Sequence, residues 1–187
     1  MAQFNAWFRE ARDSNAIEMP EAMCLSTIDK AGFPDARMVL LKGFDASGFV
    51  FYTNTRSVKG RQLAVRDKAA LTFYWGPLER QVRIQGIAAP VSDAEADAYF
   101  QTRARDSRIG AWASDQSAPL KNRKTLDDRF ASYVRKFEGK EVPRPPHWAG
   151  YRIKPTKFEF WQGRPNRLHD RFLYVQAKGW KITRLYP

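Results

Sequence analysis

Cysteine is almost absent from this chain, since Cys24 is the only one in the sequence. No internal disulfide can form, which predicts a reducing compartment, and we expect Cys24 to act as a buried small hydrophobe. Histidine is also scarce: the sequence contains only His147 and His169. With so few soft ligands, the sequence predicts that no metal ion is bound.

Long apolar runs are missing as well. No stretch approaches the roughly 18 residues that span a bilayer. Residues 1–15 mix charges with aromatics, unlike a signal peptide. We therefore predict a cytoplasmic protein with no membrane contact. The sequence also lacks a GxGxxG motif after a strand, a Walker A loop and a GxSxG nucleophile elbow, so the standard dinucleotide cradle and serine-hydrolase chemistry are not expected.

Apolar and basic residues are plentiful. The 187 residues are 43% hydrophobic and 14% aromatic, which suffices for a core and excludes a disordered chain. We predict a single domain over residues 1–187, with an N-terminal helix and lead segment in residues 1–20. The chain has 32 Lys and Arg against 20 Asp and Glu, and this net charge of +12 predicts an anionic partner. Because the basic residues alternate with core positions, we expect no nucleic-acid partner, although a nucleic-acid-binding module remains the alternative from another class.

Hydrophobic periodicity predicts short strands joined by tight turns. The expected strands are 23–28, 36–44, 48–53, 69–75, 79–88, 150–153, 157–162, 167–175 and 180–185. The expected helices are 4–12, 57–66 with Leu63 and Val65 inward, 93–103 with a Ser92–Glu95 capping box, and 121–137, and a short helix and loop are expected over 107–117. This order lacks regular strand–helix alternation, so we predict a mainly β, α+β fold: a closed antiparallel barrel with helical insertions.

The segment RLHDRF, residues 167–172, is the most distinctive feature of the sequence. As a strand it would place Arg167, His169 and Arg171 on one face. Cations on one sheet face repel each other unless water or an anion lies against them. A solvated outer face is one interpretation, but the surrounding aromatic residues favour a groove.

A second pattern is the spacing of Tyr99, Arg103 and Ser107, which recur every four residues. On a continuous helix they would lie in line, and a hydroxyl, a guanidinium and a hydroxyl together favour a phosphate clamp. An exposed helix face is the alternative. Arg37 and Lys42 lie at the two ends of an apolar strand, and their spacing places them on opposite faces. This predicts that each contacts a different ligand. Two ordinary strand ends are the alternative.

Strand residues Gln81, Arg83 and Gln85 form a third pattern, because they share one face opposite Val82 and Ile84. Uncharged amides on a sheet face can bind the edge of a heterocycle. They are equally compatible with a hydrated exterior.

Four stretches together resemble the pyridoxamine (pyridoxine) 5′-phosphate oxidase family. They are RMVLLKGFDASGFVFYTN (37–54), AALTFYWGPLERQVRIQG (69–86), YFQTRARDSRIGAWASDQS (99–117) and WAGYRIKPTKFEFWQGRPNRLHDR (148–171). The resemblance runs in family order over nearly the whole chain, and RLHDR after EFWQG is its most specific part. It implies a split β-barrel homodimer that binds FMN at each of two subunit interfaces.

The resemblance also implies roles for individual residues. The FMN contacts would be Arg37, Met38, Val39, Leu40, Leu41, Lys42, Tyr52, Thr53, Lys59, Gln81, Gln116, Ser117, Trp161 and Arg171. The substrate phosphate would contact Lys42, Tyr99, Arg103 and Ser107. Arg167 and His169 would hold the substrate ring against the flavin, and they are the predicted catalytic residues.

The implied reaction converts pyridoxamine or pyridoxine 5′-phosphate to pyridoxal 5′-phosphate. A hydride would pass to the flavin, and O2 would reoxidise it and yield H2O2, with NH3 released from the amine substrate. Two alternatives stay open: a related flavin oxidase acting on a phenazine precursor, and a flavin- or pyridoxal-phosphate-binding carrier without turnover.

The chain departs from the family pattern at three places. Val58 occupies a position that is usually Arg, where Arg56 could replace the lost phosphate donor, and Arg108 occupies a position where Gln is common. The segment before the first strand is shorter than in some members and lacks their basic, tyrosine-bearing lead.

Overall fold

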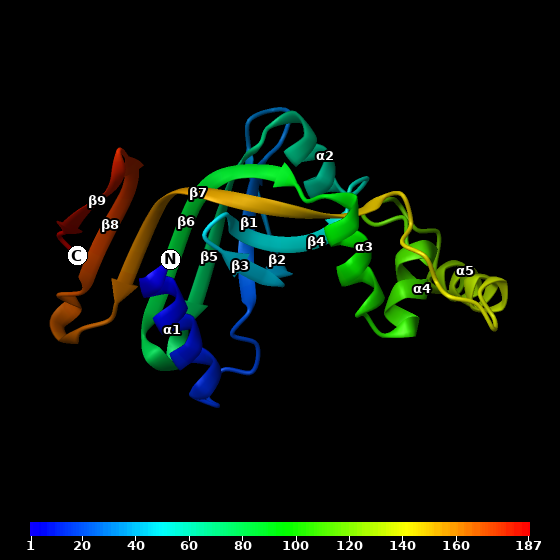
Figure 1. Cartoon of the computed structure of the whole chain (residues 1–187), viewed down its shortest axis with the longest axis horizontal. Helices are drawn as coiled ribbons and strands as arrows, with labels where there is room; N and C mark the ends of the chain where they lie inside the picture. The colour runs from blue at the N-terminus through cyan, green and yellow to red at the C-terminus, as the bar shows by residue number, and fades with distance from the viewer.

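An antiparallel sheet of nine strands forms the body of the protein, and the computed structural model describes all 187 residues (Figure 1). The strands are β1 (Ala22–Ile28), β2 (Pro34–Leu40), β3 (Gly43–Asp45), β4 (Gly48–Asn54), β5 (Lys68–Trp75), β6 (Arg80–Pro90), β7 (Trp148–Gln162), β8 (Asp170–Ala177) and β9 (Gly179–Leu185). The helices are α1 (Ala2–Asp13), α2 (Val58–Val65), α3 (Asp93–Gln101), α4 (Arg105–Ala113) and α5 (Arg123–Lys136), with short 3-10 turns at Gly76–Leu78 and Pro165–Arg167. This architecture confirms the predicted mainly β, α+β fold with helical insertions.

Helix α1 closes one side of the curled sheet. The ring of Phe4 is fully buried and meets the rings of Phe49 and Phe73 edge-on, at centroid distances of 4.8 and 5.1 Å. Trp7 and Phe8 pack against the same core. The helical spacing of aromatic residues that predicted an N-terminal helix therefore also gives its buried face.

Helices α3, α4 and α5 form a lobe at one end of the molecule, opposite the β8–β9 hairpin (Figure 1). The lobe has its own small core of Phe100, Ile109, Phe137, Val142 and Trp148. Ser92 Oγ accepts a hydrogen bond from the backbone N–H of Glu95 at 3.1 Å, as the capping box predicts. Helix α3 ends at Gln101, however, so the helix expected over 93–103 is too long.

Strand β7 corrects a second expectation. The sequence predicted separate strands at 150–153 and 157–162, but one strand of 15 residues runs through Pro155. β7 pairs with β6 along its length, with β4 over its first half and with β8 over its second half. Proline is tolerated because it lies where β7 changes neighbours, beside a bulge at Gln85/Gly86. A Cβ on Gly86 would lie 2.3 Å from the carbonyl oxygen of Lys154, so only glycine fits this bulge.

The prediction that Leu63 and Val65 of α2 both point inward was half wrong. Leu63 is 5% exposed, whereas Val65 is 65% exposed. Positions two apart on a helix lie on different faces, so the two side chains cannot share one buried surface.

The outer face of the sheet presents one continuous row of side chains across six strands. Met38, Cys24, Thr72, Arg83, Glu159 and Leu173 are consecutive partners in the register from β2 to β8. Cys24 is only half-buried in this row, contrary to the expectation that it is buried. No helix of the protein is long and apolar enough to cross a membrane.

Candidate active site

A cleft of about 480 Å³ opens where the barrel meets the helical lobe, and its volume suits a small molecule. Its walls come from β2, β4, the start of α2, helices α3 and α4, and the start of β7. The lining residues are Met38, Val39, Leu40, Lys42, Tyr52, Thr53, Asn54, Lys59, Tyr99, Arg103, Ser107, Gly110, Ala111, Ser114, Gln116 and Trp148.

Lys42 reaches the cleft because the strand predicted over 36–44 breaks in two. The backbone N–H of Leu41 donates to Glu21 O at 2.9 Å, and that of Lys42 donates to Val50 O at 2.8 Å. The chain thus crosses from the β1 side of the sheet to the β4 side within two residues. Leu41 enters the core at 5% exposure, and Lys42 lines the cleft.

Three cations and no carboxylate line the cleft. Arg103 Nη1 is buried and has no hydrogen-bond partner. Burial lowers the pKa of Arg103, and burial together with the nearby Arg37 lowers the pKa of Lys59. Desolvated cations without counter-ions are costly in the free protein, so an anion that enters this cleft gains strong, charge-assisted contacts.

Arg103 rests on a stack of three nearly parallel rings. The Tyr52 ring lies 4.1 Å from Tyr99 and 5.0 Å from Trp148, with interplanar angles of 6° in both pairs. The Arg103 guanidinium carbon lies 5.0 Å from the centre of the Trp148 ring. This cation–π contact orients the guanidinium without neutralising it. Burial, and then the nearby Glu95, raises the pKa of Tyr52 to about 12, so its hydroxyl stays protonated.

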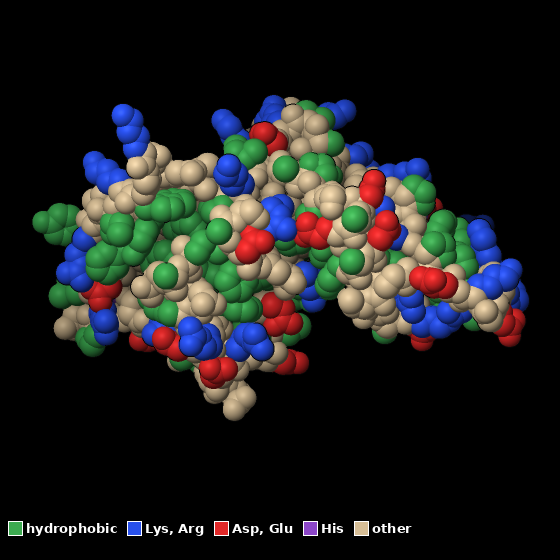
Figure 2. Space-filling model, in the orientation of Figure 1, with side chains coloured by type: hydrophobic (Ala, Val, Ile, Leu, Met, Phe, Trp, Pro, Cys, Tyr) green, Lys and Arg blue, Asp and Glu red, His purple; other side chains and the backbone are tan.

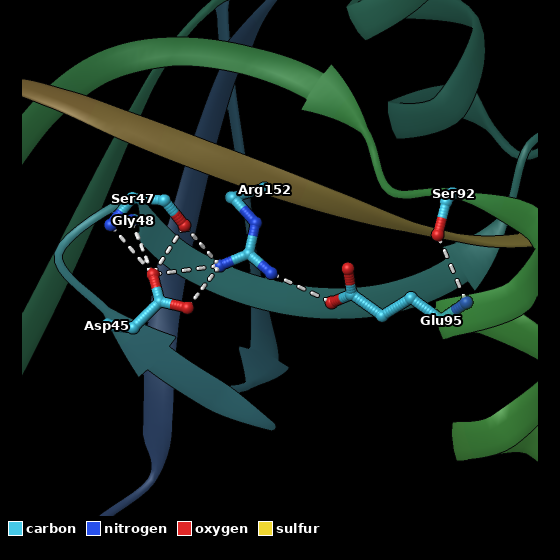
Figure 3. Close-up of polar contacts among 6 residues, drawn as sticks. All are labelled: Asp45, Ser47, Gly48, Ser92, Glu95 and Arg152. Carbon is cyan, nitrogen blue, oxygen red and sulfur yellow. Dashed lines mark hydrogen bonds and ion pairs between the residues drawn. The ribbon is translucent and has the colours of Figure 1, made fainter.

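Two arginines fix helix α3, which carries Tyr99. Arg152 of β7 donates to Asp45 Oδ1 at 3.1 Å and to Glu95 Oε1 at 2.9 Å, and so joins the β3–β4 turn to α3 (Figure 3). Arg144, in the connector after α5, pairs with Asp93 and Asp97 on α3. These ion pairs hold the helix from both sides, which sets the position of Tyr99 and the start of the turn to Arg103.

Gln116 is also oriented by the protein. Its Oε1 accepts a hydrogen bond from Thr53 Oγ1 at 3.1 Å. Because the amide oxygen is already engaged, the amide NH2 of this cleft residue is left as a free donor.

A second group of predicted residues lies on the outer sheet face at β6–β8. Gln81, Trp161 and Arg171 are direct cross-strand neighbours. The His169 ring lies 4.6 Å from the Trp161 ring, and its Nδ1 accepts from the backbone N–H of Arg164 at 3.1 Å. In the neutral ring the proton therefore resides on Nε2, which is available as a donor.

The strand predicted over 167–175 begins only at Asp170, which corrects the expected alternation of Arg167, His169 and Arg171. Arg167 belongs to a tight 3-10 turn, in which Asn166 and Arg167 have φ of 58° and 61°. This left-handed conformation redirects the backbone, so period-two alternation does not apply before Asp170.

The two groups lie far apart in the chain. Figure 1 shows the helical lobe that lines the cleft and the β8–β9 hairpin at opposite ends of the molecule, and β2 and β8 are five strand positions apart in the order of the sheet. Both lie on the outer face, since the row from Met38 to Leu173 connects them.

Comparison with known proteins identifies the family. Residues 10–134 match the family model "Pyridoxamine 5′-phosphate oxidase", and residues 148–187 match "Pyridoxine 5′-phosphate oxidase C-terminal dimerisation region". The chain belongs to the pyridoxamine 5′-phosphate oxidase family. A relative from Caulobacter vibrioides, named pyridoxine/pyridoxamine 5′-phosphate oxidase, is 56% identical over 187 residues, which is 100% of this chain and 84% of that protein. A relative of the same name from Rubrobacter xylanophilus is 54% identical over 186 residues, covering 99% and 85%.

Solved structures give the same fold. PhzG from Burkholderia lata, in complex with tetrahydrophenazine-1-carboxylic acid, superposes with a TM-score of 0.94 at 32% identity, over 100% of this chain and 91% of that chain. A pyridoxamine 5′-phosphate oxidase-related, FMN-binding protein from Nostoc punctiforme has a TM-score of 0.79 at 18% identity, over 100% and 99%. The predicted split-barrel fold is thereby confirmed.

The residues of the cleft fit an FMN of this oxidase family. Eight of the predicted cofactor contacts line it: Met38, Val39, Leu40, Lys42, Tyr52, Thr53, Lys59 and Gln116. All four residues predicted to contact the substrate phosphate also line the cleft, because Ser107 joins Lys42, Tyr99 and Arg103 although a turn interrupts the helix. The buried, unpartnered Nη1 of Arg103 is the kind of atom that a phosphate satisfies.

Several predicted cofactor contacts of the family lie outside the cleft. Arg37 pairs with Asp35, and Leu41 is in the core. Ser117, with φ of 70°, follows the cleft residue Gln116. Gln81, Trp161 and Arg171 form the second group described above.

Sequence reasoning also missed lining residues of the cleft, namely Asn54, Gly110, Ala111, Ser114 and Trp148. All five fall within the stretches that carry the family resemblance, which was the available signal.

Proposed function

We propose that this protein oxidises pyridoxamine and pyridoxine 5′-phosphates to pyridoxal 5′-phosphate with O2 as the electron acceptor. The observation that carries the proposal is the carboxylate-free cleft with its three cations, one of which has a buried, unpartnered N–H group. Two phosphate esters, one on the cofactor and one on the substrate, account for this concentration of positive charge.

The substrate phosphate is assigned to Lys42, Tyr99, Arg103 and Ser107. Arg103 presents a guanidinium oriented by Trp148, and Tyr99 presents a hydroxyl whose pKa is raised by burial and which therefore remains a donor. Each charge-assisted contact contributes about 1.5–3 kcal/mol. The clamp fixes the substrate at its phosphate, and this leaves the pyridine ring free to be placed by other groups.

FMN, when bound, supplies the chemistry by accepting a hydride from the substrate carbon and passing electrons to O2. Lys59 at the start of α2 is assigned to its phosphate. Thr53, Gln116 and the segment Met38–Leu40 are assigned to its ring system, where the oriented amide NH2 of Gln116 is a donor. These residues bind and orient the cofactor.

The second group of residues is assigned to the neighbouring active site of a homodimer. In a two-fold dimer formed through the outer sheet face, the β8 side of one chain meets the β2 side of the other. Gln81, Trp161 and Arg171 would then complete the FMN site of the partner, and Arg167 and His169 would place the substrate ring. Because His169 Nδ1 accepts from the backbone N–H of Arg164, His169 would donate from Nε2.

Exposed apolar side chains on the outer face support this dimer. Met38 on β2 and Val175 on β8 lie on this face and are 63% and 39% exposed. The other face of the β8–β9 hairpin is apolar as well, because Trp180 and Ile182 pair there with Gln176 and Tyr174, and Figure 2 shows hydrophobic side chains gathered over the region of β7–β9. The segment lies within the part that matches the dimerisation region. Covering such a patch is a driving force for association.

Adding pyridoxamine 5′-phosphate to the FMN-loaded protein under air tests the proposal. We expect equal amounts of pyridoxal 5′-phosphate and H2O2, and far less product from unphosphorylated pyridoxamine at the same concentration. A protein that binds FMN but forms neither product would be a carrier, and the proposal would fail.

The similarity to PhzG supports one second candidate function, that of an oxidase acting on a phenazine precursor. The identity of 32% to PhzG against 56% to the Caulobacter relative makes it the weaker one. Supplying a dihydrophenazine carboxylate in place of the vitamer discriminates between them, and we expect the phosphorylated vitamer to have the higher kcat/KM.

A further inference from the structure

Glu159 lies at the centre of the outer sheet face with arginines on both sides. It is 8% exposed, and its neighbours in the register are Arg83 on β6 and Leu173 on β8. Its Oε1 accepts from Arg171 Nε at 3.0 Å and Nη2 at 2.8 Å, and its Oε2 accepts from Arg83 Nη1 at 3.2 Å. Both carboxylate oxygens are therefore engaged, one by each arginine.

Arg171 is held on two edges. Besides Glu159, it donates from Nη1 to the carbonyl oxygen of Tyr186 at 3.0 Å. Of the five N–H groups of an arginine, three are thus used within the chain. The plane of the guanidinium is fixed, and two N–H groups are left to face outward. A free arginine on a sheet face would have to be ordered by its ligand, at an entropic cost.

We infer that Glu159 is a positioning residue for the cofactor site: it aims Arg171 and balances its charge before FMN is bound. The inference rests on the proposed assignment of Arg171 to the flavin of the partner subunit. Nothing in the family resemblance led us to expect a role for Glu159.

The two arginines differ in what Glu159 does for them. Arg83 makes one hydrogen bond to the carboxylate and its side chain is 50% exposed, whereas Arg171 makes two and its side chain is 28% exposed. If Glu159 only held the neighbouring strands together, loss of either arginine would have similar consequences for FMN binding. A positioning role predicts that FMN binding responds to the Glu159–Arg171 side alone.

Five variants separate these possibilities: E159Q, R83Q, R171Q and the double variants R83Q/E159Q and E159Q/R171Q. The wild-type trio has a net charge of +1, from two arginines and one glutamate, and R83Q/E159Q retains +1 from Arg171 alone. R83Q/E159Q therefore keeps the charge but loses the anchor of Arg171, and it avoids the two unpaired arginines that E159Q leaves. FMN dissociation constants are measured by flavin fluorescence quenching, and folding by circular dichroism.

We expect R83Q to bind FMN like the wild type, and R83Q/E159Q and E159Q to bind it about three- to tenfold more weakly. In the R171Q background, E159Q should have no further effect, because the group it positions is gone. The flavin midpoint potential gives a second readout: E159Q should raise it, since an unbalanced Arg171 favours the added negative charge of the reduced flavin, and R83Q should not.

The inference is overturned if R83Q/E159Q binds FMN as tightly as R83Q, or if E159Q weakens binding equally with and without Arg171. An R171Q variant that retains full FMN affinity would remove the proposed assignment of Arg171, and the inference with it. If FMN affinity falls in R171Q but not in E159Q, the assignment of Arg171 is retained and only the role of Glu159 is refuted.

Discussion

The two groups of cations in this protein differ in how the chain treats them. In the cleft, Lys42, Lys59 and Arg103 have no carboxylate partner among the lining residues. On the outer face at β7–β8, Arg171 is bound to Glu159, and Arg164 pairs with Asp170. The same residue type is left unpaired in one region and neutralised in the other.

This difference indicates that the cleft provides binding affinity and that the β7–β8 region provides orientation. An unpaired, desolvated cation gains most when an anion arrives, so the cleft is suited to bind phosphates. A cation that is already paired has less attraction to offer but a better-defined direction, so the β7–β8 region is suited to place a ring. We therefore expect substitutions in the cleft to change KM or the FMN dissociation constant, and substitutions at β7–β8 to affect kcat as well.

Arg103→Met should give the largest effect. Methionine keeps much of the stem that packs on Trp148 but removes the charge, so the substrate phosphate loses its guanidinium partner. We expect KM for pyridoxamine 5′-phosphate to rise about ten- to a hundredfold with little change in kcat. Steady-state assays of peroxide release measure both.

Arg108→Gln is the matched control for this variant. Arg108 lies five residues further along but does not line the cleft, and its guanidinium donates to Gln101. Its loss should leave KM unchanged. A normal KM in R103M, or an equal rise in R108Q, would contradict the clamp and the proposed division between the two regions.

The phosphate clamp shows how far the sequence could lead. Tyr99, Arg103 and Ser107 were grouped by helical spacing, yet the helix ends at Gln101 and a turn precedes α4. The three side chains still line one cleft, because the lobe folds the turn against the barrel. The spacing thus grouped residues that do share one cleft, but for an incomplete geometric reason, and the resemblance to the family supplied their proposed role.

Long-range contacts were beyond the sequence. Alternation predicted the buried face of β6, with Val82 and Ile84 both fully buried. It failed at Arg167, where two residues with positive φ interrupt the pattern. The pairing of Glu159 with Arg83 and Arg171 depends on strand order and register, which local periodicity does not contain.

Lys59→Met should weaken FMN binding by about tenfold at neutral pH through loss of a charge-assisted contact. The pH dependence sharpens the prediction. Burial lowers the pKa of Lys59, so its ammonium group loses a proton at a lower pH than an ordinary lysine. Phosphate pairs with the charged form only, so affinity should fall as the pH rises through that lowered pKa and stay level below it.

Fluorescence titrations of FMN at pH 7 to 10 measure this effect. In K59M, the fall in FMN affinity that comes from deprotonation of Lys59 should be absent. Lys68→Met, which changes an exposed lysine of β5, should behave like the wild type. An unchanged alkaline decline in K59M would show that another group provides the charge in the cleft.

Gly110→Ala tests whether the cleft wall touches its ligand. A Cβ on Gly110 would meet no protein atom within 4 Å, although the residue lines the cleft in the interior of α4. Alanine should stabilise the helix by about 1 kcal/mol and raise the melting temperature by about 2–4 °C. We expect a several-fold higher KM or FMN dissociation constant at the same time, and a larger one for Gly110→Val. A more stable enzyme with unaltered binding constants would place the ligand elsewhere.

Val58→Arg should produce the smallest change, and in the opposite direction. Val58 opens α2 beside Lys59 and is half-buried, and it occupies a position that is usually Arg in the family. Arg56, the predicted substitute, is exposed and lies outside the cleft lining. Restoring the charge should tighten FMN binding about three- to tenfold, while the uncharged Val58→Gln should not. If the gain in V58R arises from charge in the cleft, it should shrink as salt is added, because partly exposed ion pairs are screened. A gain shared by V58Q and V58R would instead point to packing at the start of α2, and the cleft would then already hold all the positive charge that the FMN phosphate can use.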